Sequence, residues 1–407
     1  MKVQQLFSEK LKGLSLVDIC FESSLSMEVD WGNLESLPLN LIFDKLAEPV
    51  DRIYFSVVCK NWYAIAKFNY ENGQIQNNVL PMLMIPTKNK CRTERSLYGI
   101  SSKTDYNIKL PVPHNKRFCG SSHGWLAKVD NSSEHTLITL LNPFKDALSI
   151  TLPPIYIMDI LRRKRYYECN VHKVVLSADP TIRPHDYVVV AIYGMSKYIA
   201  FLKAGQQIWT YIDQKYFCFN DAIFYKDLVY VVGRWNDIYS FDVCNLKKKE
   251  VIPKVLSRED DDYAHGVYLV KSLEGDLWLV KKIIAEKDEF FTHGAERFEV
   301  FHLELDLQSG KVIRMVKLNS LGDNVLFVGD SDSISMSASY FSNYLQKDSI
   351  YYTDDFYDDT PNPYPNGPFD MKVYNIKEEK FSQHCPFQPW FRQKPPALWV
   401  IPPFQLN

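Results

Sequence analysis

Short β-like runs dominate the chain after about residue 77, and they recur at a nearly regular spacing. Each run is rich in β-branched and aromatic residues and is bounded by turn residues, as strands are. Runs that would open a new group of strands begin near residues 80, 118, 172, 221, 268 and 325. The intervals of roughly 40 to 60 residues are typical of β-propeller blades with four strands each. We therefore predict a β-propeller over residues 77–403, with a large β-sandwich or barrel as the alternative.

Three segments in the second half of the chain share one further pattern. Each combines apolar residues with an acidic residue or Asn near its end, and each is followed by a charged or polar turn: Asp237–Val243, Phe298–Asp306 and Asp370–Ile376. The amino-acid composition also favours strands. Phe, Trp and Tyr make up 14% of the residues, and aromatic rings suit a pleated, half-buried surface. The predicted fold class is therefore mainly β.

Residues 31–70 have a different, helical rhythm. Leu41, Ile42 and Leu46 recur at helical spacing, and Pro38 fits the first turn of a helix with Ser36 as its N-cap. After an interruption at a proline, a second stretch places apolar residues three or four positions apart: Ile53, Val57, Val58, Trp62 and Ala66. We predict a small all-α module over residues 31–70, preceded by a weakly patterned leader over residues 1–30.

The predicted helical module has too few residues to bury all of its apolar side chains in a core of its own. The side chains that we expect to remain uncovered are Leu37, Pro38, Leu41, Ile42, Ile53, Val58 and Trp62. A partner with a groove for amphipathic helices would bury them. The alternative is that they pack against the β-propeller.

Net charge and cysteine usage exclude several classes of protein. The formal net charge of -2 argues against a chain that grips nucleic acid through bulk charge. The first residues lack the apolar stretch of a secretory signal, and the longest apolar run, near residues 187–193, is too short to span a membrane as a helix. The eight cysteines form no CxxC pair and no zinc-finger spacing. We expect free thiols in a reducing compartment, the cytoplasm and/or the nucleus, with no nucleic-acid or membrane partner.

Catalytic and metal-binding motifs are weak throughout. Residues 120–124 match the GxSxG nucleophile elbow, which requires a strand, a sharp turn and then a helix. Here residues 125–129 read as a second strand, so we predict a tight glycine turn between two strands. The segment 330–333 lacks the glycine and the distal Glu of a calcium loop. We predict no catalytic residue, metal or cofactor; an enzyme with Ser122 as its nucleophile is the alternative.

The helical segment resembles the F-box. Residues 37–46 match its leucine-proline start, residues 49–53 its middle, and residues 57–62 its valine-cysteine-x-x-tryptophan end. Asn40 stands where the F-box usually has Glu, which is a surface position. Order and spacing both match, so the resemblance is fairly specific.

The rest of the chain resembles the C-terminal domain of plant F-box proteins of the KIB type, a β-propeller related to kelch-like folds. The matching stretches are residues 120–126, 141–144, 221–225, 268–270, 275–280, 321–329, 389–391 and 399–403. Each stretch is short, and their order along the chain carries the resemblance.

The resemblance implies a function and a set of partners. In that family the F-box docks on a Skp1-like adaptor, which joins it to a cullin-RING ubiquitin ligase. The chain would then be a non-catalytic substrate receptor of an SCF-type ligase, and its propeller would bind a protein substrate. A regulator that binds its target without joining a ligase is the alternative. The adaptor-binding residues that the resemblance implies are Leu37, Pro38, Leu41, Ile42, Leu46, Ile53, Val58, Cys59 and Trp62.

The sequence does not identify the substrate or the residues that bind it. We expect substrate contacts on the loops of one propeller face, since recognition residues usually lie on loops held by a rigid scaffold. The candidate loops are residues 162–165, 287–297 and 354–368.

Overall fold

The computed structural model describes most of the chain in two compact units, Met1–Leu80 with Ile401–Asn407, and Pro81–Val400. The described residues are 30–71, 79–86, 94–106, 110, 112–113, 116–131, 136–145, 148–157, 170–212, 218–233, 237–242, 264–284, 295–306, 308–353, 371–385 and 396–402.

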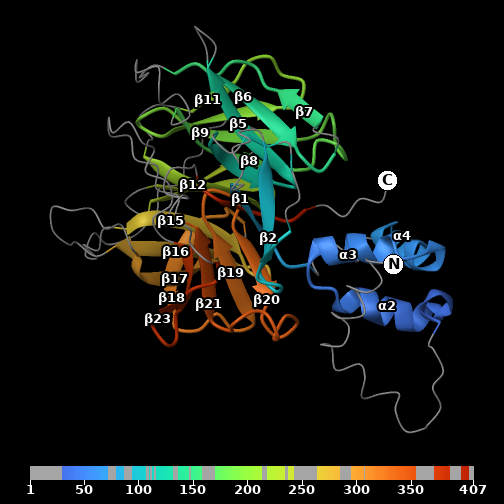
Figure 1. Ribbon diagram of the computed structural model, residues 1–407. Coiled ribbons are helices and arrows are strands. Elements are labelled where there is room, and N and C mark those ends of the chain that lie inside the picture. The colour runs from blue at the N-terminus through green and yellow to red at the C-terminus, as the bar shows by residue number, and fades with distance from the viewer. Residues whose placement is uncertain are drawn as a thin grey trace. The chain divides into compact units, whose positions relative to one another are not determined.

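The larger unit is a six-bladed β-propeller, with six sheets among the described residues (Figure 1). The first two sheets comprise β1 (Met82–Pro86), β2 (Arg95–Gly99), β3 (Thr104–Asp105) and β24 (Leu398–Val400), then β4 (Phe118–Ser122), β5 (Trp125–Asn131), β6 (Thr136–Asn142) and β7 (Leu148–Thr151). The next two comprise β8 (Val171–Leu176), β9 (Val188–Tyr193), β10 (Tyr198–Lys203) and β11 (Thr210–Tyr211), then β12 (Phe219–Tyr225), β13 (Leu228–Gly233) and β14 (Ile238–Asp242). The last two comprise β15 (Ala264–Lys271), β16 (Leu277–Ile284), β17 (Ala295–Leu305) and β18 (Val312–Leu318), then β19 (Asn324–Val328), β20 (Ile334–Ser337), β21 (Ser349–Thr353), β22 (Met371–Asn375) and β23 (Lys380–Ser382).

The blades are ordinary antiparallel sheets whose inner strands meet at the centre. Strands β4, β8, β12 and β15 contact one another in that order, while the outer strands β3 and β7 are largely exposed. The last blade differs, because β19 pairs in parallel with β21 and antiparallel with β20. Apolar side chains fill the spaces between neighbouring sheets, for example those of β6 and β9 between the second and third blades. The predicted β-propeller is confirmed, and the sandwich or barrel alternative is wrong.

The first blade takes strands from both ends of the propeller. Strand β24 pairs antiparallel with β1, so that Leu83 lies opposite Trp399. The indole of Trp399 is fully buried, donates to the carbonyl of Val328 at 3.2 Å and packs edge-on against Phe327. The buried Arg95 guanidinium adds a second link, because it donates to the carbonyls of Pro396 at 3.3 Å and of residue 116 at 2.8 Å. These contacts close the ring.

One glycine lets the centre of the propeller close tightly. Gly120 lies within β4 at a φ of 155°, and a Cβ added there would stand 2.1 Å from the carbonyl oxygen of Val174 in β8. Because that oxygen belongs to the backbone of a central strand, it cannot move aside cheaply. A side chain at position 120 would therefore force the inner strands of two blades apart.

The smaller unit contains the predicted helices. They are η2 (Trp31–Asn33), α2 (Ser36–Lys45), α3 (Pro49–Ser56) and α4 (Lys60–Glu71). Helix α2 begins one residue earlier than predicted, because Ser36 is its first residue and Glu35 occupies the N-cap position without a side-chain hydrogen bond. Pro49 interrupts the helical pattern as expected and opens α3, where its missing N–H costs no helical hydrogen bond. No helix in the described part of the chain is long and apolar enough to cross a membrane.

The core of the helical module is built on three aromatic rings. Phe55 packs against Phe43 at 5.1 Å and against Trp62 at 4.4 Å between ring centroids. The guanidinium of the buried Arg52 lies over the Phe43 ring at 4.9 Å. The remaining buried members of this core are Leu39, Ile42, Leu46 and Ala66.

We expect Trp399→Ala to lower the free energy of unfolding of the propeller by about 3–5 kcal/mol, because the change empties a buried aromatic site and weakens the ring closure. Urea denaturation measures this change. Leu273→Ala is the control, since that side chain is half exposed and its removal should cost less than about 1 kcal/mol. An equal cost for the two variants would contradict the role of Trp399 in closing the ring.

Candidate functional site

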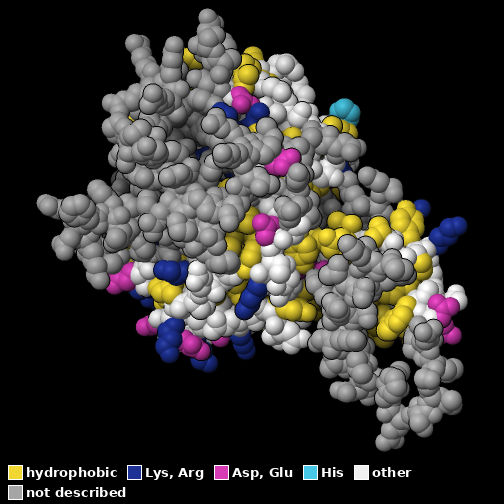
Figure 2. All heavy atoms as spheres, viewed as in Figure 1, with side chains coloured by type: hydrophobic (Ala, Val, Ile, Leu, Met, Phe, Trp, Pro, Cys, Tyr) yellow, Lys and Arg dark blue, Asp and Glu magenta, His cyan; other side chains and the backbone are white. Residues whose placement is uncertain are grey.

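Helices α2 and α3 expose apolar side chains that their own core does not use. Leu37 and Leu41 are 68% and 51% exposed on α2, while Ile53 on α3 and Val57 just after it are 38% and 64% exposed. Figure 2 shows hydrophobic side chains at the surface of this module. The two residues of each pair are four positions apart and therefore lie on one side of their helix. We call these four residues the exposed apolar surface.

The structure divides the nine predicted adaptor-binding residues into two groups. Four are exposed: Leu37, Pro38, Leu41 and Ile53. Ile42, Leu46 and Trp62 are buried in the module core, and Val58 and Cys59 are half-buried against it. The prediction that Ile42 and Trp62 remain uncovered is wrong, because a bundle of three short helices closes its own core around Phe55. Val58 is covered in part. The adaptor-binding role of the nine residues stays a prediction.

The valine-cysteine-x-x-tryptophan end of the motif holds the segment that precedes α2. The indole N–H of Trp62 donates to the carbonyl of Trp31 at 2.8 Å. The Asn61 amide donates to the carbonyl of Leu34 at 2.8 Å. The sulfur of Cys59 lies 3.9 Å from the carbonyl oxygen of Gly32. Cys59 and Trp62 are therefore positioned to fix the start of α2 rather than to expose apolar surface themselves.

Sequence reasoning missed several exposed side chains of this module. Tyr54, Tyr63 and Phe68 are exposed, and so is Trp31 before α2. Val57 was part of the helical pattern but not of the predicted binding set. Its spacing of four from Ile53 is the signal that could have identified it.

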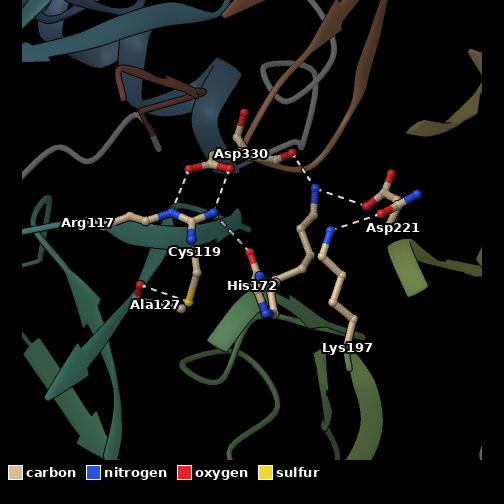
Figure 3. A network of polar contacts seen from close by, with 10 residues as sticks. Arg117, Cys119, Ala127, His172, Lys197, Asp221 and Asp330 are labelled. Atoms are coloured by element: carbon tan, nitrogen blue, oxygen red, sulfur yellow. Dashed lines mark hydrogen bonds and ion pairs between the residues drawn. The ribbon is translucent and has the colours of Figure 1, made fainter. Parts of the chain in front are cut away.

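A network of polar contacts lies among the inner strands of the propeller (Figure 3). Its first part is a buried ion pair between Arg117, just before β4, and Asp330, just after β19. The guanidinium makes two hydrogen bonds to the carboxylate, at 3.0 and 3.1 Å, and also donates to the carbonyl of His172 at 3.4 Å. This pair links the last blade to the second and third blades.

The second part of the network centres on Lys173 of β8. Its ammonium lies 3.0 Å from the Asp221 carboxylate of β12 and donates to the carbonyl of Ser331 at 2.7 Å. Asp221 also accepts a hydrogen bond from the backbone N–H of Leu269 in β15 at 2.8 Å. Burial lowers the pKa of Lys173, but Asp221 and Asp332 nearby outweigh it and the pKa is raised, so the ammonium stays charged.

Ser122 belongs to this network and not to a nucleophile elbow. Strand β4 continues through a turn at His123 and Gly124, both at positive φ, into strand β5, so no helix follows the serine. The predicted tight turn is confirmed. Ser122 is 3% exposed; its hydroxyl donates to Asp332 and accepts from the backbone N–H of Leu176. The hydroxyl thus connects two strands and the segment after β19.

Two other groups of the network have pKa values that keep them neutral. Burial raises the pKa of the Cys119 thiol to about 12, and this thiol donates to the carbonyl of Ala127. Burial lowers the pKa of His172 to about 3, so its ring is neutral; one ring nitrogen lies 2.8 Å from the carbonyl of Gly194. Within the described ranges, no group of three or more His, Cys, Asp or Glu side chains is arranged to hold a metal ion.

The predicted substrate-binding loops lie almost entirely outside the described residues. Residues 162–165 and 354–368 fall there, as do residues 287–294, while residues 295–297 form the start of β17. The predicted leader, apart from residue 30, lies outside the described residues as well.

Comparisons with known proteins agree with the fold. A family model described as KIB1-4 beta-propeller matches residues 97–375. Three Arabidopsis thaliana proteins with F-box in their names are similar along most of their lengths. At5g55150 is 21% identical over 90% of this chain and 96% of its own, SKIP23 is 22% identical over 76% and 81%, and At2g26160 is 22% identical over 80% and 96%. These matches confirm the resemblance to plant F-box proteins with a KIB-type propeller.

We expect Trp62→Ala to disrupt the helical module, because it removes an aromatic core side chain and the hydrogen bond to residue 31, at a cost of about 3–5 kcal/mol. Hydrogen exchange of the α2–α4 amides in the full chain should show the loss of protection. Leu41→Ala, which truncates an exposed side chain, should leave protection nearly unchanged. Equal loss in both variants would show that the exposed apolar surface is part of the core.

A fluorophosphonate probe should not label Ser122, because its hydroxyl is buried and both of its hydrogen bonds are engaged. Mass spectrometry of the probe-treated full chain tests this expectation. Labelling that disappears in Ser122→Ala would favour the enzyme alternative instead.

Proposed function

The chain belongs to the KIB1-4 beta-propeller family, and from this premise we propose that it is the substrate receptor of an SCF-type ubiquitin ligase. Its helical module would bind a Skp1-like adaptor, and its propeller would bind the protein to be ubiquitinated. The word F-box in the names of the three relatives supports the proposed binding of an adaptor by the helical module.

The exposed apolar surface is the observation that carries the proposal. Leu37, Leu41, Ile53 and Val57 face solvent while a complete core lies beneath them. Several exposed apolar side chains on one small module are typical of a surface that binds a partner. Amphipathic helices with this arrangement dock into apolar grooves. At about 25 cal/mol per Å² of apolar area removed from water, such docking drives association, less the cost of ordering both partners.

The propeller would contribute by proximity and not by chemistry. Holding a substrate lysine near the charged ubiquitin-conjugating enzyme raises the effective concentration of that lysine. For this the propeller only has to bind and orient the substrate. The neutral thiol of Cys119, the neutral imidazole of His172 and the engaged Ser122 hydroxyl support a receptor over a hydrolase. A rigid six-bladed ring with loops at both ends of its sheets suits this role.

We expect the full chain to co-purify with a Skp1-like adaptor, and Leu37→Ala/Leu41→Ala to weaken that complex at least about tenfold, since two exposed anchors are lost. Circular dichroism checks that the variant stays folded. The matched control is Ile182→Ala/Ile208→Ala, which truncates two exposed apolar side chains of the propeller and should bind normally.

The possible outcomes separate the functions clearly. A wild-type complex that is lost in the helical variant and kept in the propeller variant supports the receptor. If the wild type forms no complex, the ligase proposal fails and a protein-binding regulator outside the ligase becomes the better account. Equal weakening in both variants would place the adaptor contact outside the exposed apolar surface.

A further inference from the structure

The charged groups at the centre of the propeller do not balance pairwise. Two cations, Arg117 and Lys173, face three carboxyl groups, Asp221, Asp330 and Asp332. Arg117 is paired with Asp330, and Lys173 with Asp221. Asp332 is left without a cation of its own.

Asp332 lies in segment 329–333, which connects β19 to β20 and contacts the inner strands β4 and β8. Its backbone N–H donates to the carbonyl of Ser121, and one carboxyl oxygen accepts from the Ser122 hydroxyl. Asp332 as a whole is half-buried, but its other carboxyl oxygen is buried and has no hydrogen-bond partner among the described residues. A buried carboxylate that lacks a counterion of its own is costly, and the usual outcome is that the group keeps its proton.

The charged and titratable groups around Asp332 come from several elements. Strand β8 contributes Lys173, which attracts the ionised carboxylate, and β12 contributes Asp221, which repels it. Strand β4 contributes the neutral Ser122 hydroxyl, and Asp330 of the same segment is neutralised by Arg117. Burial raises the pKa of the Asp332 carboxyl to about 7, because desolvation outweighs Lys173 and the hydrogen bond from Ser122.

We propose that Asp332 keeps its proton in the folded propeller and acts as a latch, so that ionisation loosens segment 329–333 from the strands that surround it. The latch would let pH set how firmly the centre of the ring is held. It is independent of adaptor binding, because every group involved belongs to the propeller.

The direction of the pH dependence follows from the protons bound in each state. When the segment opens to water, Asp332 returns to its ordinary pKa near 3.8, whereas in the closed ring the pKa is about 7. Between these values the closed state holds one proton more than the open state. The closed state is therefore most stable, relative to the open state, at low pH. Its stability falls as the pH rises from about 4 to about 7 and does not change further above that range.

Hydrogen exchange of the full chain, followed on peptides that cover residues 329–333, tests the latch. Protection factors correct for the intrinsic pH dependence of exchange. One proton changes the equilibrium between the closed and open segment by up to about tenfold per pH unit. Over the interval from pH 5.5 to 7.0 we therefore expect the protection of this segment in the wild type to fall at least tenfold. Asp332→Asn, which mimics the neutral carboxyl, should show protection that is flat over this range.

The control is Asp330→Asn, which removes the partner of Arg117 but leaves Asp332 in place. It should lower protection at every pH while keeping the wild-type slope. Comparison with Asp332→Asn also removes any contribution from His172, which is buried and neutral in both proteins. A flat wild-type profile, or the same slope in Asp332→Asn, would overturn the latch.

Infrared spectroscopy of the wild type provides a test that needs no variant to fold. A protonated, buried carboxyl group gives a carbonyl band apart from those of ionised carboxylates. We expect this band at pH 6 and its disappearance with a midpoint near 7. Its absence at pH 6 would show that Asp332 is ionised and would overturn the proposal.

Discussion

The pairing of β24 with β1 is the contact on which the rest of the propeller depends. It joins segments that are far apart in the chain, and the hydrogen bond beside it from Arg95 of β2 to Pro396 spans 301 positions. Closing so long a loop costs conformational entropy that local contacts do not repay. Each sheet also packs against two neighbours, so an open seam would expose the faces of the first and last blades together. The ring is therefore stable as a whole, and the buried Trp399 at the seam supports contacts well beyond its own blade.

Two kinds of interaction hold the blades in place, and they have different effects. Apolar side chains fill the spaces between sheets and supply most of the driving force, because such burial is non-directional and scales with area. The polar centre is directional. A blade shifted along its neighbour would leave Lys173 or Asp330 buried without a counterion, which costs several kcal/mol. The centre thus selects the correct alignment among arrangements that apolar packing alone would tolerate.

The strand rhythm made most of the fold predictable, since each blade carries its own local alternation and turn residues. The GxSxG stretch shows how context decides a motif, because the strand-like residues that follow Ser122 were enough to predict the hairpin of β4 and β5. Two features left no local signal. Pairing of residues 398–400 with β1 depends on a partner more than 300 residues away. The centre of the ring brings Asp332 to Ser122 only after the fold forms, so a segment that reads as an ordinary polar turn proves to hold the buried residues Asp330 and Ser331 and a buried carboxyl oxygen of Asp332.

The helical module shows a further limit of sequence reasoning. Helical spacing gave the right elements, but it did not separate Ile42 and Trp62, which are inside, from Leu37 and Leu41, which are outside. All four are apolar and belong to the same helical pattern. Only the packing around Phe55 distinguishes them.

The pairing of β24 with β1 also limits how a ring of this kind can change its number of blades. Because the first sheet already joins one strand from after residue 397 to three from before residue 106, a blade appended beyond β24 would find no open edge to enter. A seventh blade would have to be inserted between two existing ones, for instance in the short connection from β18 to β19. The ring would then widen, and segment 329–333 would no longer reach both β4 and β8. The diameter of the propeller and the length of the segment that fills its centre are therefore constrained to change together.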